Sequence, residues 1–197
     1  MRSPMPSRIR FASAHSVFDA FPELSYVAAR PANDVDPLVH ARALSTSSRP
    51  SDAILFLSHL LPRREAVWWA VQCVRALSAG ADGDEALRAA ETWVRTPEDD
   101  NRRAALAIAN DSDRRKPATW LAFAAGWSGG SLLPADQKPV PVPPGACAMA
   151  ANTAITMAIA AGDPRGIVDR IAACAEAGVR FASGGEPTVS NLGAALR

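Results

Sequence analysis

One stretch limits the possible folds of this chain more than any other, because it is apolar around most of a helix. Between Leu61 and Leu77 the sequence is LPRREAVWWAVQCVRAL. At roughly 100° per residue, its alanine, valine, cysteine and leucine side chains spread over one broad face, with Trp69 at its border. A helix with so little polar surface must be surrounded by other elements. We therefore predict a helical domain built around this central helix.

The polar side chains of the central helix share a narrow strip. Besides Glu65, the strip contains four residues at nearly helical spacing: Arg64, Trp68, Gln72 and Arg75. Tryptophan and arginine dominate the binding energy of many protein interfaces, and a guanidinium can stack on an indole. We take these four residues as the candidate partner-contact site. The alternative, which is the more favoured one, is that another helix or the proline-rich link of the same chain covers Trp68.

The rest of the chain also carries helical signals. Apolar residues recur at spacings of three and four, and capping residues and prolines stand where helices should begin. One predicted helix adds two pairs of opposite charge, Glu98 with Arg102 and Asp99 with Arg103. No stretch is typical of a strand. The sequence thus predicts one all-α domain over residues 1–197, an irregular bundle of about eight helices, with residues 1–10 frayed.

A proline-rich link interrupts the helical pattern over residues 132–144. Its second half, KPVPVPP from Lys138 to Pro144, favours an extended polyproline conformation. We prefer the interpretation that the link is a rigid strap over the protein's own tryptophans, such as Trp120 or Trp127. The alternative is an exposed polyproline ligand for the aromatic groove of a partner.

Composition excludes several classes of protein. A chain of 197 residues with 48% hydrophobic content can bury a sizeable core. Its 21 basic and 20 acidic residues give a net charge of +1, which argues against a general nucleic-acid binder. The uncharged run from Gly145 to Gly162 is slightly short for a membrane span, so we expect a buried helix there.

The cysteines and histidines suggest no metal or catalytic site. The three cysteines lack zinc-ligand spacing, and we expect buried free thiols in a reducing, cytoplasmic compartment, since no secretory signal is visible. The histidines His15, His40 and His59 are scattered, and the chain has no nucleophile elbow, phosphate loop or dinucleotide fingerprint. We predict no catalytic residue, no metal and no cofactor. A deep pocket that joins a histidine to acids of shifted pKa would instead favour an enzyme.

Several segments together resemble a known family. They are Phe18–Leu24, Leu60–Ala70, Ala90–Pro97, Arg102–Ala105, Trp127–Pro134 with the link that follows, and Ala177–Gly184. In these segments the chain resembles an uncharacterised family of bacterial proteins of similar length, associated with gene neighbourhoods of type VI secretion. The resemblance brings no catalytic residues. It implies a bacterial accessory protein.

The predicted function combines these observations. We predict a non-catalytic accessory or adaptor protein that acts through contacts with a protein partner, without nucleic acid and without a membrane span. Two alternatives remain open, an immunity-like inhibitor that binds a toxin and an enzyme with an unrecognised site. A concentrated acidic or basic surface facing one partner would distinguish the inhibitor from the adaptor.

Overall fold

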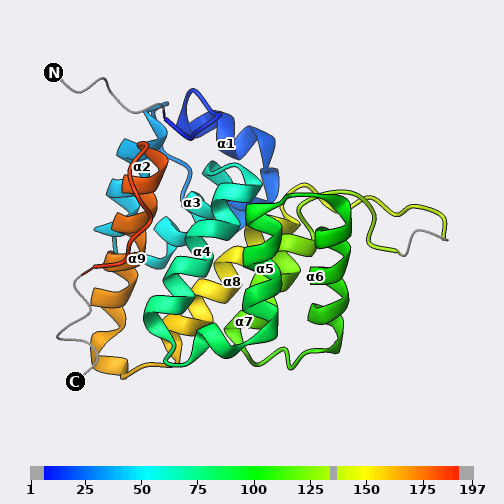
Figure 1. Cartoon of the computed structure of the whole chain (residues 1–197). Helices are drawn as coiled ribbons and strands as arrows, with labels where there is room; N and C mark the ends of the chain where they lie inside the picture. Colours follow the sequence, from blue (N-terminus) through cyan, green and yellow to red (C-terminus); the bar gives the residue numbers. More distant parts are fainter. Residues whose placement is uncertain (1–6, 134–136, 191–197) are drawn as a thin grey trace, which may run out of the picture. The chain divides into compact units, whose positions relative to one another are not determined.

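The computed structural model describes residues 7–133 and 137–190 of the chain. Within these ranges it contains nine α-helices and no β-strand beyond one isolated bridge. The predicted all-α bundle is therefore confirmed. Close contacts divide the chain into two compact units, residues 1–62 with 159–197, and residues 63–158 (Figure 1). The single-domain organisation expected from the sequence stays a prediction.

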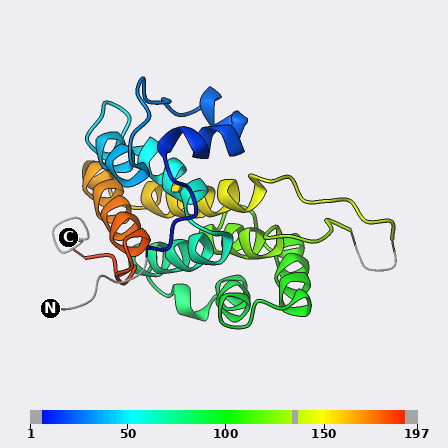
Figure 2. The same cartoon turned by 90° about the horizontal axis from the view of Figure 1, so that it is seen from above.

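The first unit contains helices from both ends of the chain: α1 (Ala14–Ala20), α2 (Pro37–Ser45), α3 (Ser51–Leu60) and α9 (Ile167–Ala182). Helices α2, α3 and α9 pack on one another, and both views show α2 beside α9 (Figures 1 and 2). All of α3 except Ser51 is buried, as its apolar sequence requires. The predicted N-caps of α1 and α2 are present. Ser13 forms a capping box with Ser16, and Asp36 accepts hydrogen bonds from the first turn of α2.

The N-terminal segment differs from the expected frayed start of residues 1–10. Its first six residues lie outside the described part of the chain. Arg8, however, donates from Nη1 to the carbonyls of Phe181 at 2.8 Å and Gly185 at 2.6 Å. Its guanidinium also lies 4.3 Å from the centre of the Phe181 ring. Residues from Ser7 onward are thus attached to the end of α9, where an arginine favourably meets helix C-terminal carbonyls.

The second unit is built from α4 (Arg63–Leu77), α5 (Glu85–Arg95), α6 (Asp99–Asp111), α7 (Pro117–Gly126) and almost all of α8 (Ala146–Ala160). Helices α5, α6 and α7 pack on one another, and α4 packs on α5 and α7. A Cβ at Gly126 would lie 2.8 Å from the Cβ of Leu106, so α6 and α7 approach each other closely there. The packing of α6 on α7 thus requires a glycine at residue 126.

The predicted central helix is α4, and its apolar face is buried. Ala66, Val67, Trp69, Ala70, Val71, Cys73 and Val74 are each at most 1% exposed. Pro62 ends α3 as expected, since α4 begins at the next residue, Arg63. The uncharged run forms α8, as predicted. No helix among the described residues is both long enough and apolar enough for a bilayer.

Candidate functional site

The candidate stripe of Arg64, Trp68, Gln72 and Arg75 lies along one side of α4, and its two arginines are attached to the neighbouring α5 region. Arg64 donates from Nε to the carbonyl of Val94 at 2.6 Å. Arg75 donates to Asp82 at 2.6 Å and to Glu91 at 3.0 Å. The two ends of the stripe therefore hold α5 and the turn before it.

A network of charges surrounds Arg75. Glu91 accepts from both Arg75 and Arg95, the latter at 2.7 Å. Partial burial raises the pKa of Glu91, but the Arg95 and Arg75 guanidinium groups outweigh burial and hold that pKa below its usual value. Partial burial likewise lowers the pKa of Arg75, and its carboxylate partners raise it above the usual value. Both groups are thus charged over the ordinary pH range.

The middle of the stripe is half-buried. The expected stacking of Arg64 on Trp68 is not among the cation–π contacts of the described residues, because Arg64 is directed to Val94 instead. The amide nitrogen of Gln72 is buried without a hydrogen-bond partner. Trp68 and Gln72 stay a predicted contact site, of which only part of each side chain is accessible.

A second cluster joins segments that lie far apart in the sequence. Arg63 donates from Nη1 to the carbonyl of Ser128 at 2.7 Å. Arg102, only 4% exposed, donates from Nη1 to the carbonyls of Gly126 at 3.0 Å and Ser131 at 3.4 Å. Its Nε donates to Asp99 at 2.7 Å. The two arginines thus hold the loop of residues 126–131 after α7 from two sides.

This pairing corrects one sequence prediction and confirms another. Arg102 pairs with Asp99 and not with Glu98 as expected, whereas Arg103 pairs with Asp99 at 2.6 Å as expected. The position of the loop against Arg102 also explains why residue 130 is a glycine. Gly130 has φ +67°, and a Cβ there would lie 2.7 Å from Nη2 of Arg102. Only glycine combines this backbone conformation with such a close approach.

The loop continues into a ribbon made with the proline-rich link. Leu132 N–H donates to Val140 O at 2.8 Å, and Val142 N–H donates to Gly130 O at 3.4 Å. The hydroxyl of buried Ser131 accepts from the backbone N–H groups of Leu133 and Val140 at 3.0 and 3.1 Å. The ribbon therefore has a fixed inner edge, although only Lys138, Val140 and Val142 can donate a backbone hydrogen bond between residues 138 and 144.

The described part of the link, residues 137–144, does not form the internal strap that the sequence favoured. Residues 137–141 are exposed, and Val140 has 42% of its surface accessible. Both views show the yellow-green ribbon leading away from α6 and α7 (Figures 1 and 2). Trp120 and Trp127 instead pack on Phe123, with ring centres 5.6 and 4.7 Å away. The two tryptophan rings therefore pack on Phe123 and on each other, in place of the predicted contact with the proline-rich link.

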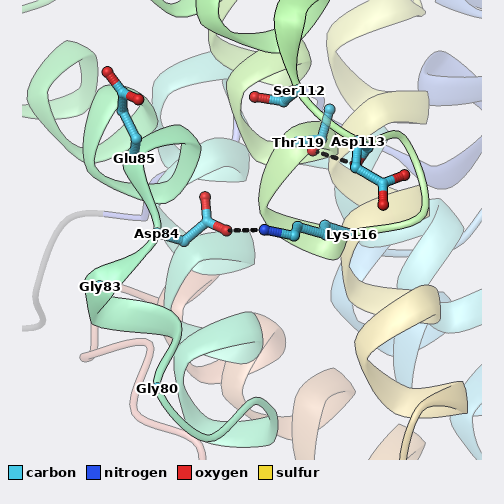
Figure 3. A pocket seen from close by; sticks show the side chains of 8 residues that line it. All are labelled: Gly80, Gly83, Asp84, Glu85, Ser112, Asp113, Lys116 and Thr119. Atoms are coloured by element: carbon cyan, nitrogen blue, oxygen red, sulfur yellow. Dashed lines mark hydrogen bonds and ion pairs between the residues drawn. The ribbon is translucent and has the colours of Figure 1, made fainter.

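A polar pocket of about 440 Å³ lies between the turn before α5 and the loop before α7 (Figure 3). Asp84 and Lys116 point toward each other across it at 3.5 Å. Asp84 also caps α5, by accepting from Ala86 N–H at 2.9 Å. Hydrogen bonds from the side chain and backbone of Arg115 lower the pKa of Asp113. Asp84, Asp113 and Lys116 of the pocket are therefore engaged by other groups of the chain, and the lining of this pocket contains no histidine to act with the acids.

The histidines belong to the first unit, and none of them is among the residues that line this pocket. The ring of His40 packs edge-on against Phe56, with centres 4.8 Å apart, and His59 packs likewise against Phe21 at 5.0 Å. The Nε2 atoms of both are buried without a partner. Burial lowers the pKa of both imidazoles. No group of three metal-ligating side chains occurs among the described residues.

Comparison with known proteins gives a family for most of the chain. Residues 40–182 match the model of a family of unknown function, DUF6931. The chain belongs to this family. No curated protein and no solved structure matches it. The expectation of an uncharacterised family is thereby confirmed.

The DUF6931 match spans both arginine clusters described above. It contains the stripe on α4, the loop held by Arg63 and Arg102, and the proline-rich ribbon. All three segments could be singled out in the sequence. The contact of Arg63 and Arg102 with the 126–131 loop was not predicted. The glycines at 129 and 130 were the available signal, although they suggested only a helix end.

Proposed function

We propose that this DUF6931 protein is a non-catalytic accessory or adaptor protein that acts through protein–protein contacts. The observation that carries the proposal is the exposure of the proline-rich segment 137–141 on a ribbon anchored by Ser131. Prolines lose little conformational freedom on binding, so an exposed and pre-ordered proline segment suits recognition by another protein. The apolar surface of Val140 adds to its suitability.

The stripe on α4 is a secondary contact surface in this proposal. Its arginines are bound to α5 and the turn before it, which leaves Trp68 and Gln72 as the half-buried residues of the stripe without such a bond. A partner that covers Trp68 would gain the large buried area typical of interface hot spots. We therefore assign the principal contact to the ribbon and a supporting contact to Trp68.

The setting that we propose is bacterial type VI secretion. It rests on the resemblance of the Arg63–Trp69 and Trp127–Ser131 segments to proteins of those gene neighbourhoods. We propose a cytoplasmic adaptor, in keeping with three buried cysteines. The Cys147 thiol, whose pKa burial raises to about 12, is a packing residue in this view and not a nucleophile.

Quantitative affinity purification from the native bacterium tests the proposal. The bait is the full chain, and the matched control replaces Lys138, Pro139, Val140 and Pro141 by alternating serine and glycine. We expect a reproducible protein partner that the control bait loses. Recovery of the same proteins by both baits would contradict the ribbon as the principal contact. A ribbon-dependent partner from outside the secretion machinery would refute the setting alone.

A further inference from the structure

A cluster of aromatic rings joins α1 to α2 and α3 in the first unit, and two of these rings are imidazoles. Phe18 of α1 lies against His40 of α2 and Phe56 of α3, with ring centres 5.9 and 5.8 Å away. Phe21, which follows α1, lies against His59 of α3 at 5.0 Å. His40 in turn contacts Phe56 at 4.8 Å. Each of the two phenylalanines from α1 and its end therefore rests on a histidine.

Polar bonds attach α1 to the residues that follow it and not to α2 or α3. The N–H of Ala14 donates to the carbonyl of Val35 at 2.8 Å, and the N–H of His15 donates to the carboxylate of Asp34 at 3.0 Å. In the part of the chain that the structure describes, no hydrogen bond joins α1 or the short helix η1 (Pro22–Tyr26) to a residue of α2 or α3. The α1–η1 segment, residues 14–26, is therefore held on these two helices by side-chain packing.

One ring nitrogen of each histidine in the cluster is buried without a partner. Nδ1 of His59 lies 2.8 Å from the carbonyl of Leu55, which can only accept, so Nδ1 carries the proton of the neutral ring. A second proton would go to Nε2, which is buried and has no acceptor. Nε2 of His40 is buried in the same way. The packed cluster consequently favours neutral rings, because a buried cation without a partner is strongly unfavourable.

The charges around the two rings do not reverse this preference. Burial lowers the pKa of His59, and its carbonyl partner and Glu23 of η1 offset burial only in part. Burial also lowers the pKa of His40, against the carbonyl of Ala29 and together with the charge of His15. The other ionisable side chains of α1, α2, α3 and α9 are either exposed or bound to a different partner: Asp19, Arg42, Asp52, Asp169, Arg170, Glu176 and Arg180.

Release of the α1–η1 segment gives both imidazoles access to water. Their pKa values then return to the usual value of about 6.5, so in acid the released state takes up protons that the packed state rejects. The segment is held fully above pH 6.5, and the hold weakens as the pH falls toward the lowered values. Proton uptake and release of the segment are therefore coupled.

We propose that the α1–η1 segment is an acid-released cover, which detaches from α2 and α3 when His40 and His59 take up protons and thereby uncovers the ring of Phe56. Helices α2, α3 and α9 pack on one another without the segment, so they stay folded when it leaves. The apolar surface uncovered includes Phe56, which is fully buried in the packed state. This inference concerns the first unit alone and does not rest on the adaptor role of the ribbon.

Hydrogen exchange of the full chain, read by mass spectrometry and corrected for the intrinsic effect of pH, tests the cover. Residues 17–21 should lose protection between pH 7.5 and pH 5. At pH 5 they should also be far less protected than α9, because they exchange by release of the segment whereas α9 exchanges only when the unit unfolds.

The variants show which groups take up the protons. His40→Leu with His59→Leu should keep residues 17–21 equally protected at both pH values, because leucine cannot take up a proton. The matched control is His15→Gln, which removes the histidine of the segment itself. It should lose protection in acid at least as much as the wild type, since only the imidazoles of the cluster drive the release.

Two exchange results would overturn the cover. Equal protection of residues 17–21 and α9 at pH 5 would show that acid unfolds the unit as a whole, and an acid loss in the double variant as large as in the wild type would assign the protons to other groups. An NMR titration of the wild type needs no variant. The ring signals of Phe18 and Phe21 should change at the pH at which His40 and His59 titrate, and a change at a different pH would also refute the coupling.

Discussion

At the scale of single residues, Arg102 shows how a buried cation can organise a loop. Its guanidinium donates hydrogen bonds to Asp99 on its own helix and to two backbone carbonyls of the 126–131 loop. Carbonyls at the end of a helix have no partner within that helix, so a buried donor is needed there. Gly130 lies against the same guanidinium and allows the loop to close over it.

Arg102→Met should destabilise the protein strongly, because it leaves the carbonyls of Gly126 and Ser131 without their donor. We expect a loss of about 3 kcal/mol in the free energy of unfolding, measured by urea denaturation. Arg103→Met is the matched control. Arg103 pairs with the same Asp99 but is one-third exposed, so its loss should cost less than about 1 kcal/mol. Equal losses for both variants would contradict the role of Arg102 in the loop.

Gly130→Ala should also destabilise the protein, because alanine resists the φ of +67° and its Cβ would press on Arg102. The expected loss is about 1–3 kcal/mol, again from urea denaturation. Gly129→Ala serves as the control, since a Cβ there would meet only Arg63 Nη1 at an ordinary 3.7 Å. A Gly130→Ala variant as stable as Gly129→Ala would show that the loop relaxes freely.

The interactions of some of these residues could be predicted from the sequence, and those of others could not. The pair of Asp99 with Arg103 could be predicted, because both residues lie on one helix at a fixed spacing. Arg102 is also an arginine and is the neighbour of Arg103 in α6. Its burial depends on a loop more than twenty residues away, and nothing local to Arg102 announces that loop.

At the scale of elements, α4 was predictable because its apolar face is wide and its length fits a helix.

The two neighbouring tryptophans of α4 test which face of the helix is buried. Trp69 is fully buried, so Trp69→Ala should cost about 3–5 kcal/mol in the free energy of unfolding. Trp68 is only half-buried, and Trp68→Ala should cost clearly less. Chemical denaturation of both variants measures the difference, and a Trp68→Ala variant that is the less stable of the two would reverse our assignment of the faces.

The proline-rich link was predictable in conformation but not in position. Local sterics make alternating prolines extended in any surroundings. Whether the extended segment lies on the protein or away from it depends on Ser131, whose hydroxyl binds Val140 N–H from nine residues away. A serine in a glycine-rich loop carries no sign of that pairing, so the strap over Trp120 or Trp127 was a reasonable but wrong expectation.

At the scale of the whole molecule, the nine helices of the described residues were largely foreseen, whereas their grouping was not. Periodicity and capping residues define each helix from nearby sequence. The first unit, however, joins residues 7–62 to α9 near the other end of the chain. Such long-range closure has no periodic signature, because it depends on which apolar faces fit together.

Stability should fall when the solution is made acidic, because His40 and His59 are buried as neutral rings. Their pKa values lie below 6.5 in the folded chain, so the unfolded chain takes up protons first as the pH decreases. Their contribution is complete above pH 6.5 and is lost as the pH falls toward the lowered values. We expect the free energy of unfolding, measured from urea midpoints, to be lower at pH 5 than at pH 7.5.

A variant without these rings gives the control for the pH experiment. His40→Leu with His59→Leu removes both titrating groups, so its stability should change much less between the two pH values. Carboxylates such as Asp99, whose hydrogen bonds with Arg102 and Arg103 lower its pKa below 3.8, do not lose their charge until the solution is more acidic still. An equally steep pH dependence in the double variant would assign the effect to other groups.

The alternating prolines have a consequence for how the protein behaves at high concentration. An extended, valine-bearing segment in open solvent would ordinarily be a hazard, because identical segments can stack into fibrils through their unpaired amides. Here position 141 makes no hydrogen bond to residues 130–132 and faces outward, as does position 139 two residues earlier, and both hold prolines, which have no amide hydrogen to offer the next molecule. These prolines therefore disfavour polymerisation through the segment, although Val140 is 42% exposed.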